Sequence, residues 1–362
     1  MISERLIASL VCTMPECRSV HGCTRLVETD DTGLRCPSCG THYPRRAGYV
    51  DLMLATTEGN VPSEQSHTSL YVSQESEFAE TLDYKRIGMP LLGAGVRQRA
   101  IRRMLHLTKQ DRLVELGCGN GKFVYWNRKQ VDWAVGIDPA PLFAVEALET
   151  VDLCRADART LPFEDGAFTA AMSIDVLEHL PLADIEAYLR EARRVLEVGG
   201  RVFIYSNTRE GSRLDFAVRG ARLLSAWLGR RGLIDNSRDT LRKSDHVKAL
   251  ATYPELEATL RRCGFRVREV IFWNGLFQSA IENLLVKIAE SALRRLNKKA
   301  KSPQAEVGED KVRSRMRGRI ARRGVTYRAM RLLTELMWLD LALFGRWRAG
   351  PYFLLAERED AA

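Results

Sequence analysis

The chain has 362 residues, of which 45% are hydrophobic and 28% are charged, and its formal net charge is +9 at pH 7. This length accommodates one large α/β domain together with an accessory domain. The composition is ordinary for a globular protein, and no apolar run reaches the ~18 residues that a membrane-spanning helix needs. These features argue against an integral membrane protein.

The positive charge is concentrated in residues 287–331, which hold fifteen Lys and Arg residues against four Asp and Glu residues. An anionic partner should therefore meet this segment. The first ten residues include Glu4 and Arg5, so we expect no signal peptide in them, and the eight cysteines then indicate reduced thiols or a metal site. We expect a cytoplasmic protein, with peripheral attachment to the inner membrane as an open alternative.

Five of the eight cysteines lie in residues 1–54. Cys36 and Cys39 flank a Pro-Ser turn that ends in a glycine, an arrangement that turns two thiolates toward one ion. Cys12 and Cys17 follow a strand-like segment at residues 6–11 and would complete a tetrahedral zinc site. His21 and Cys23 are rival ligands for that first pair. The segment has too few apolar residues for a core of its own, so we predict a structural zinc ion for a domain at residues 1–55.

Residues 56–76 are rich in polar residues and predict a linker. Residues 78–107 predict helical structure, in which Tyr84 is either a plain core or surface residue or, as the family resemblance given below implies, a neighbour of a bound ligand. We assign residues 77–362 to the main domain, with helical insertions at about 209–250 and 277–349.

The main domain begins with a buried strand at residues 112–116, a turn containing Gly117, Gly119 and Gly121, and a helix from about Lys122. A turn without Cβ atoms lets a ligand approach the backbone at the carboxyl end of a strand. A second strand ends in Asp138, roughly 20 residues later, where doubly wound folds place an acid against ribose hydroxyls. A third strand, residues 153–158, leads to Asp157, and a fourth, residues 169–175, leads to Asp175.

An amphipathic helix at residues 184–196, a Gly-Gly pair and an apolar strand at residues 201–206 follow. With Glu-Leu-Gly-Cys-Gly-Asn-Gly at residues 115–121, Gly-Ile-Asp at 136–138, Ala-Asp-Ala at 156–158 and Glu-His-Leu at 178–180, this part resembles the class I S-adenosylmethionine-dependent methyltransferases of the ubiquinone-methyltransferase-like group. The resemblance covers about residues 110–206 and departs at Val198, where the family usually has proline. It implies a Rossmann-like α/β fold with a seven-stranded sheet. The last two strands would lie at residues 265–273 and 350–358.

The resemblance also implies site roles. Glu115 would face the methionine ammonium, and Asp138 would accept hydrogen bonds from both ribose hydroxyls. Asp157 would accept from the adenine amino group, beside the backbone N–H of Ala158. The other implied cofactor contacts come from the glycine turn: Gly117, Cys118, Gly119 and Gly121.

Two residues at or just after the end of the fourth strand, Asp175 and His179, are candidates for catalysis. His179 has the chemistry of a general base for a hydroxyl acceptor, although it could simply hold its loop. Asp175 is better suited to orienting the loop than to moving a proton. The residues at 173–176 lack the Asn/Asp-Pro-Pro-aromatic motif of methyltransferases that act on exocyclic nitrogens of nucleic-acid bases, so the resemblance disfavours that chemistry.

The N-terminal cysteine segment, in turn, resembles the Trm112-like zinc ribbons that precede some methyltransferases, which keeps an RNA substrate under consideration. Against RNA, basic amphipathic helices at residues 213–234 and 277–296 suit an anionic membrane surface with a small-molecule, lipid or glycolipid acceptor. A further apolar helix is expected at about 325–344. These helices could also form a substrate lid or a dimer interface, and the sequence does not set the oligomeric state. A non-catalytic adaptor on the same fold is a last alternative.

Overall fold

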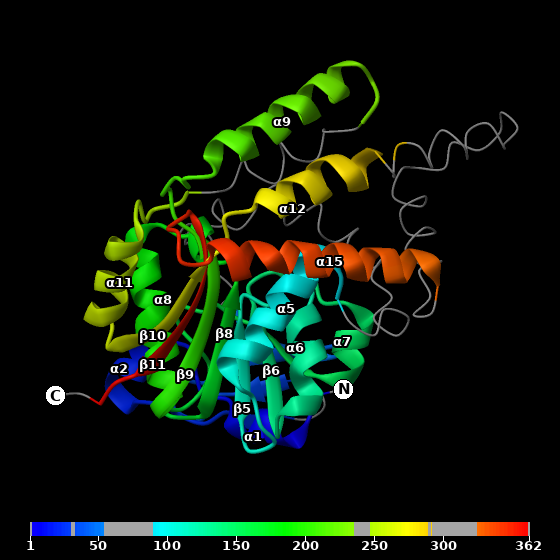
Figure 1. Ribbon diagram of the computed structural model, residues 1–362. Helices are drawn as coiled ribbons and strands as arrows, with labels where there is room; N and C mark the ends of the chain where they lie inside the picture. The colour runs from blue at the N-terminus through cyan, green and yellow to red at the C-terminus, as the bar shows by residue number, and fades with distance from the viewer. Residues whose placement is uncertain are drawn as a thin grey trace, which may run out of the picture.

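The computed structural model describes residues 2–29, 33–53, 90–234, 247–288, 291 and 324–360. Most of the basic segment 287–331 lies outside the described residues, as do the predicted linker 56–76 and Tyr84. The described part is built around one twisted sheet, with helices against both faces and a stack of further helices beyond one end of the strands (Figure 1).

The strand order confirms the predicted Rossmann-like sheet. Seven strands occur in the order β7-β6-β5-β8-β9-β11-β10. The first five are mutually parallel, whereas β11 runs antiparallel to both β9 and β10. Their bounds are β5 (Arg112–Leu116), β6 (Trp133–Asp138), β7 (Asp152–Arg155), β8 (Phe168–Ile174), β9 (Leu196–Asn207), β10 (Phe265–Phe272) and β11 (Pro351–Arg358).

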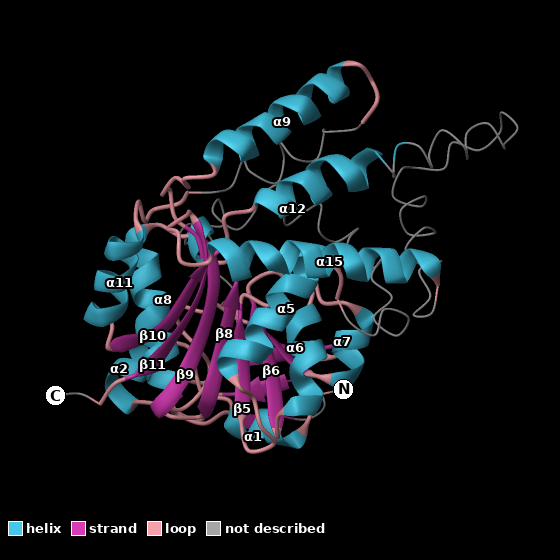
Figure 2. Ribbon diagram, in the orientation of Figure 1, coloured by secondary structure: helices cyan, strands magenta, loops and turns pink. Residues whose placement is uncertain are grey.

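Each face of the sheet has its own buried core. On one face lie α5 (Leu92–Leu105), α6 (Lys122–Asn127) and α7 (Val145–Thr150), and on the other lie α8 (Leu182–Val195) and α11 (Tyr253–Arg262) (Figure 2). The central strands are buried on both faces because helices cover both, which explains their nearly continuous apolar sequence. Ligands of such sheets bind at the carboxyl ends of the parallel strands.

The N-terminal segment extends this sheet. It comprises α1 (Glu4–Ser9), α2 (Pro15–His21), β1 (Val27–Thr29), β2 (Gly33–Arg35), β3 (His42–Arg46) and β4 (Tyr49–Asp51). β4 pairs in parallel with β7, so that Val50 lies opposite Cys154. The apolar side chains of the segment, such as Leu10 and Tyr43, join the core beneath α8 and α11. This shared core supplies the apolar burial that the segment lacks by itself.

The prediction of a strand at residues 6–11 was wrong. The segment begins as a helix, α1, because Ser3 caps it by accepting a hydrogen bond from the Leu6 backbone N–H at 3.0 Å. Leu10 and Val11 form isolated bridges to Phe163 and Arg25 only after the helix ends.

Three long helical segments form a stack beyond the carboxyl ends of the strands (Figure 1). α9 (Asp215–Arg230) contacts α12 (Leu276–Ala280) and the π-helical turn Ile281–Val286 that continues α12. α12 packs on α15 (Val325–Phe344), which packs on α5. Among the described residues, no helix combines the length and the apolar character needed to cross a membrane.

Candidate functional site

The glycine turn joins the end of β5 to the start of α6. Gly117, Gly119 and Gly121 have φ angles of 75°, 54° and 79°, in the left-handed region that favours glycine. A Cβ atom on Gly117 would collide with Val176, and one on Gly121 would lie 2.8 Å from the Ala147 Cβ. The backbone conformation therefore favours glycine at all three positions, and packing requires it at two of them, so the presence of these glycines alone does not indicate a ligand.

Asp138 at the end of β6 lies directly beside this turn. Its Oδ2 accepts a hydrogen bond from the Gly119 N–H at 2.7 Å, and its Oδ1 accepts one from the Ala140 N–H at 2.9 Å. The turn is also tied to β6 itself, because the N–H groups of Gly117 and Cys118 donate to the Ile137 carbonyl. The backbone thus holds the carboxylate in a set orientation at the carboxyl edge of the sheet. A carboxylate has about four acceptor positions, so one held by two N–H groups can still accept from hydroxyl groups.

Glu115 is almost fully buried within β5, two residues before Gly117. Its Oε2 accepts a 2.6 Å hydrogen bond from the Val124 N–H in the first turn of α6. Burial raises the pKa of the Glu115 carboxyl well above its usual value, and the bond from Val124 only partly offsets this rise. A cation placed against this carboxylate would restore its charge.

Asp157 and Ala158 follow β7, which ends at Arg155, two residues before the predicted terminal acid. The Asp157 carboxylate is held by Arg159, whose Nη2 lies 2.6 Å from Oδ2. Arg159 also pairs with Asp184 at 2.9 Å. An adenine amino group would therefore share Asp157 with a guanidinium, and the predicted adenine contact stays a prediction.

Comparison with known proteins decides the family. Residues 114–204, which contain the turn, Glu115, Asp138 and Asp157, match the family model described as a methyltransferase domain. The chain contains a class I S-adenosylmethionine-dependent methyltransferase domain. This match begins within β5 and ends within β9, so it covers the parallel half of the sheet and its carboxyl-end loops.

Two relatives illustrate the range of similar proteins. The ubiquinone biosynthesis O-methyltransferase of Azorhizobium caulinodans is 27% identical over 175 residues, which are 46% of this chain and 64% of that protein. The tRNA (carboxymethyluridine(34)-5-O)-methyltransferase alkbh8 of Xenopus tropicalis is 33% identical over 108 residues, which are 27% of this chain and 16% of that protein. The chain thus spans less than two thirds of these relatives.

Solved structures with a similar arrangement include phosphoethanolamine N-methyltransferase 2 of Haemonchus contortus in complex with S-adenosyl-L-methionine. That likeness has a TM-score of 0.49 at 16% identity and covers 84% of this chain and 62% of the other. A complex of the Haloferax volcanii Trm112 methyltransferase activator with a methyltransferase reaches a TM-score of 0.41 at 14% identity, covering 74% of this chain and 90% of the other.

On the other side of the glycine turn, the methyltransferase domain places Asp175 just after β8. Asp175 has a φ angle of 58°, which is unusual for a residue other than glycine. Its carboxylate pairs with Arg97 of α5 at 3.3 Å, and this guanidinium lies 4.6 Å from the ring centre of Tyr205. Burial lowers the pKa of Arg97, but Asp175 and Tyr205 outweigh this effect, so the guanidinium stays charged. No sequence motif marked Arg97, which lies 78 positions before its partner.

His179 ends a single 3-10 turn, Leu177–His179, and its N–H donates to the Val176 carbonyl. Beside it, Glu178 is buried and accepts hydrogen bonds from Ser206 and, at 3.1 Å, from Asn207. Burial raises the pKa of Glu178, and Asp175 raises it further. Glu178 thus joins the ends of β8 and β9, a role that its position in the Glu-His-Leu motif does not reveal. The catalytic role proposed for His179 stays a prediction.

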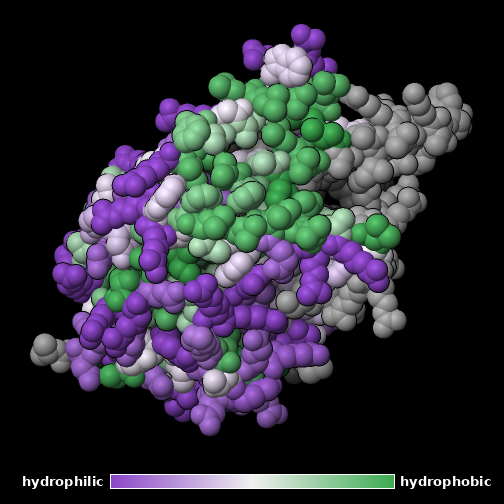
Figure 3. Space-filling model, in the orientation of Figure 1, coloured by the Kyte–Doolittle hydropathy of each residue, from purple (hydrophilic) through white to green (hydrophobic). Residues whose placement is uncertain are grey.

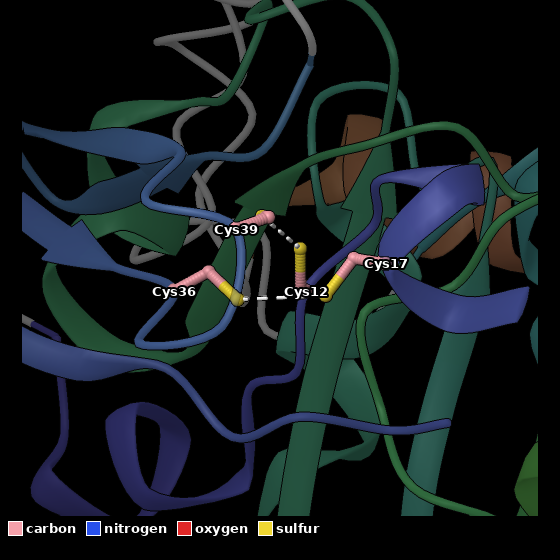
Figure 4. Close-up of side chains that lie close together, drawn as sticks. All are labelled: Cys12, Cys17, Cys36 and Cys39. Carbon is pink, nitrogen blue, oxygen red and sulfur yellow. Dashed lines mark hydrogen bonds between the residues drawn. The ribbon is translucent and has the colours of Figure 1, made fainter. Parts of the chain in front are cut away.

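The four predicted zinc ligands converge in the N-terminal segment (Figure 4). The Sγ atoms of Cys12, Cys17, Cys36 and Cys39 all lie within 4.8 Å of one another. The Cys12–Cys39 and Cys17–Cys36 sulfur distances are 3.6 and 3.7 Å. Four thiolates around one zinc ion at about 2.3 Å stand about 3.8 Å apart, so the cluster has the size of a tetrahedral zinc site.

The rival ligands do not join this cluster. In the described part of the chain, the cysteine group is the one set that could hold a metal, and neither His21 nor Cys23 belongs to it. The Cys23 sulfur lies instead 3.8 Å from Nη1 of Arg194 on α8. The structure thus brings together the four cysteines that the spacing predicted, and zinc itself remains a proposal.

Arg18 of α2 links the cysteine cluster to the methyltransferase domain through hydrogen bonds and an ion pair. Its Nε donates to the Cys12 carbonyl at 2.9 Å, its Nη2 donates to the Leu161 carbonyl, and its Nη1 pairs with Glu191 of α8 at 3.3 Å. The Val11 N–H donates to the Pro162 carbonyl at 3.0 Å. The cluster therefore supports the chain that follows Asp157.

Proposed function

We propose that this protein transfers a methyl group from S-adenosylmethionine to a small-molecule or lipid acceptor. The identity of the methyl donor rests on the Asp138 carboxylate, which the Gly119 and Ala140 N–H groups hold beside the glycine turn. This arrangement offers a fixed acceptor for the two ribose hydroxyls. The bound donor supplies an electrophilic methyl group on a sulfonium, and the protein then has to align it with the acceptor atom.

In this proposal the cofactor contacts run along three strand ends. Asp138 holds the ribose, Glu115 faces the methionine ammonium, and Asp157 with Ala158 borders the adenine. Gly117, Cys118, Gly119 and Gly121 form the turn that approaches the methionine and ribose. Asp175 orients the loop after β8 through Arg97, and His179 takes a proton from a hydroxyl acceptor.

The proposed class of methyl acceptor rests on the helices beyond the carboxyl ends of the strands. α9, the π-helical turn after α12, and α15 stand where acceptors of open α/β sheets bind, and they carry exposed apolar side chains such as Leu223, Leu285 and Leu332. Exposed apolar side chains at this edge of the sheet favour an acceptor with an apolar portion, such as a lipid, over a phosphodiester chain. An O-methyltransferase of ubiquinone biosynthesis is among the similar proteins, which agrees with such an acceptor.

RNA methylation is a second candidate, favoured by the similarity to a tRNA methyltransferase and by the basic segment 287–331. The two candidates differ in where a labelled methyl group goes. The full-length protein would be incubated with methyl-labelled S-adenosylmethionine and, separately, with lipid extract, water-soluble metabolites and total RNA from the same cells. We expect label in the lipid or metabolite fraction. Label confined to RNA would replace the proposal with the second candidate.

His179→Ala is the informative variant in this assay. If the imidazole is the general base, the variant keeps its affinity for S-adenosylmethionine and loses about 100-fold or more of turnover. Normal turnover with a normal pH profile would leave His179 a structural residue. A protein that fails to bind S-adenosylmethionine would instead be the non-catalytic adaptor.

A further inference from the structure

α9 is a long helix with few buried side chains. Of its 16 residues, Val218 and Ser225 are the buried ones. By contrast Phe216, Leu223 and Trp227 are 74%, 69% and 45% exposed. These three residues are spaced 7 and 4 positions apart, so they share one side of the helix. Most helices in proteins owe their stability to a packed apolar face, and α9 presents such a face without a partner among the described residues.

The exposed apolar surface continues over the neighbouring helices. Figure 3 shows it running across α9, α12 and α15 on one side of the molecule. Leu285 follows α12 in the π-helical turn and is 52% exposed, and Leu332 and Leu343 of α15 are 62% and 60% exposed. We call the surface formed by Phe216, Leu223, Trp227, Leu285, Leu332 and Leu343 the apolar helical face. A contiguous face of this kind marks an interaction site.

An arginine-lined cavity lies at the place where α9 begins and α15 ends. It has a volume of about 380 Å³ and is lined by Arg213, Arg346 and Arg348 together with Gly211 and Trp347. Asp215 lies on the rim beside Gly211. None of the three arginines forms an ion pair with an acidic residue that the structure describes. The cavity therefore carries net positive charge.

Hydrogen bonds fix the two loops that form this cavity. Asn274 Nδ2 donates to the carbonyls of Phe344 and Trp347 at 2.8 and 3.0 Å, and Ser212 Oγ donates to Asn274 Oδ1. The Thr208 N–H donates to the Gly350 carbonyl at 2.8 Å. Arg213 lies over the Trp347 ring at 6.0 Å. The cavity is thus a built feature, next to the apolar helical face.

We propose that the apolar helical face lies on an anionic lipid bilayer and that the arginine-lined cavity takes a lipid headgroup phosphate. An apolar helix surface with tryptophan and a basic border matches the two parts of a membrane interface, acyl chains and anionic headgroups. A nucleic acid would satisfy the arginines but not the apolar face, because nucleic-acid interfaces are polar. A second copy of the chain would cover the apolar face while bringing further arginines toward the same cavity.

The test is co-sedimentation of the full chain with vesicles of phosphatidylcholine and phosphatidylglycerol in equal amounts, against vesicles of phosphatidylcholine alone. We expect binding to the anionic vesicles that weakens as salt is added, since salt screens exposed charges. Absence of binding to the anionic vesicles, or equal binding to both kinds, would overturn the proposal.

Two variants separate the parts of the surface. Arg213→Gln, Arg346→Gln and Arg348→Gln together should lower the partition coefficient about a hundredfold, at about fivefold for each arginine near an anionic surface. The control Arg102→Gln, Lys109→Gln and Arg266→Gln removes the same charge from exposed positions elsewhere and should keep most of the binding. Leu223→Gln with Trp227→Gln should also abolish binding. Equal losses in the arginine variant and its control would reduce the effect to net charge and contradict the cavity.

Two further readouts keep the outcomes distinct. If light scattering shows a dimer that Leu223→Gln with Trp227→Gln converts to a monomer, the face is a subunit interface and the membrane proposal fails. Titration of the same samples with S-adenosylmethionine reports separately on the cofactor site, which these variants do not touch. Loss of vesicle binding with normal cofactor binding would leave the proposed function standing.

Discussion

At the scale of single residues, Glu115 carries the clearest electrostatic consequence. Its pKa in the folded protein lies well above the ordinary 4.5 because the carboxyl is buried. Above pH 4.5 the unfolded chain releases a proton that the folded chain retains, so this group makes stability fall as the pH rises toward its folded pKa. We propose that a carboxyl group is present at position 115 despite this loss of stability because an ionised Glu115 binds the ammonium of the methionine moiety.

Glu115→Gln tests both halves of this account. In urea unfolding, the variant should gain stability relative to wild type as the pH rises from acid to neutral, because the amide has no proton to lose. Its affinity for S-adenosylmethionine should fall about 10-fold or more, as expected for loss of a hydrogen bond to a charged group. A parallel pH dependence of stability in the two proteins would contradict the raised pKa.

Asp175 combines a left-handed backbone with an ion pair, and two substitutions separate these contributions. Asparagine tolerates the left-handed region, whereas alanine does not, so Asp175→Ala should be less stable than Asp175→Asn by about 1 kcal/mol. Both variants lose the charge that pairs with Arg97. Thermal unfolding of the two variants measures the difference, and equal melting temperatures would rule out backbone strain at this position.

At the scale of elements, the cysteine segment should depend on its metal. We expect one zinc ion per chain, and chelation should lower the melting temperature by about 5 °C or more, because the free energy of binding is part of the free energy of folding. Cys36→Ser should have the same effect. Cys23→Ser is the matched control, since that sulfur lies outside the cluster. Full stability after chelation would mean that the four thiols need no metal.

The elements that sequence patterns predicted best are those with sharp chemical boundaries. Residues 112–116 and 325–344 have the predicted bounds and β6 ends at Asp138 as predicted, because a glycine or an acid ends each strand and glycines flank the helix. The four cysteines meet as their spacing indicated. In contrast, the Ser3 cap turned the predicted strand at 6–11 into α1, because a capped polar first turn outweighs a short apolar run.

Long-range pairings could not be predicted in this way. The parallel pairing of β4 with β7 joins chain segments about a hundred residues apart, and nothing in either segment specifies the partner. The same holds for Arg97 with Asp175. Arg159 lies only two residues after Asp157, yet its guanidinium could be placed against that carboxylate only once the loop geometry was known.

At the scale of the whole molecule, the N-terminal segment and the methyltransferase domain share one sheet and one core. We propose a zinc-binding unit at residues 1–55, a linker at 56–76 and a methyltransferase unit at 77–362, with insertions at about 209–250 and 277–349. Because Leu10, Tyr43 and Val50 pack in the same cluster as Phe163 and Leu189, we expect these units to unfold together. Scanning calorimetry of the zinc-loaded protein should show one transition for both. A separate early transition that disappears on chelation would contradict the shared core.

The central claim is that Asp138, beside the glycine turn, holds the ribose of S-adenosylmethionine. Calorimetric titration of the wild type and of Asp138→Asn with this cofactor tests it most directly, with Asp165→Asn as a control on an exposed carboxylate that is 72% accessible. The account predicts binding to the wild type and the control, and about 10- to 100-fold weaker binding to Asp138→Asn, which also loses one of the two backbone hydrogen bonds that this side chain accepts. Equal affinity in all three proteins, or no binding to the wild type, would contradict it.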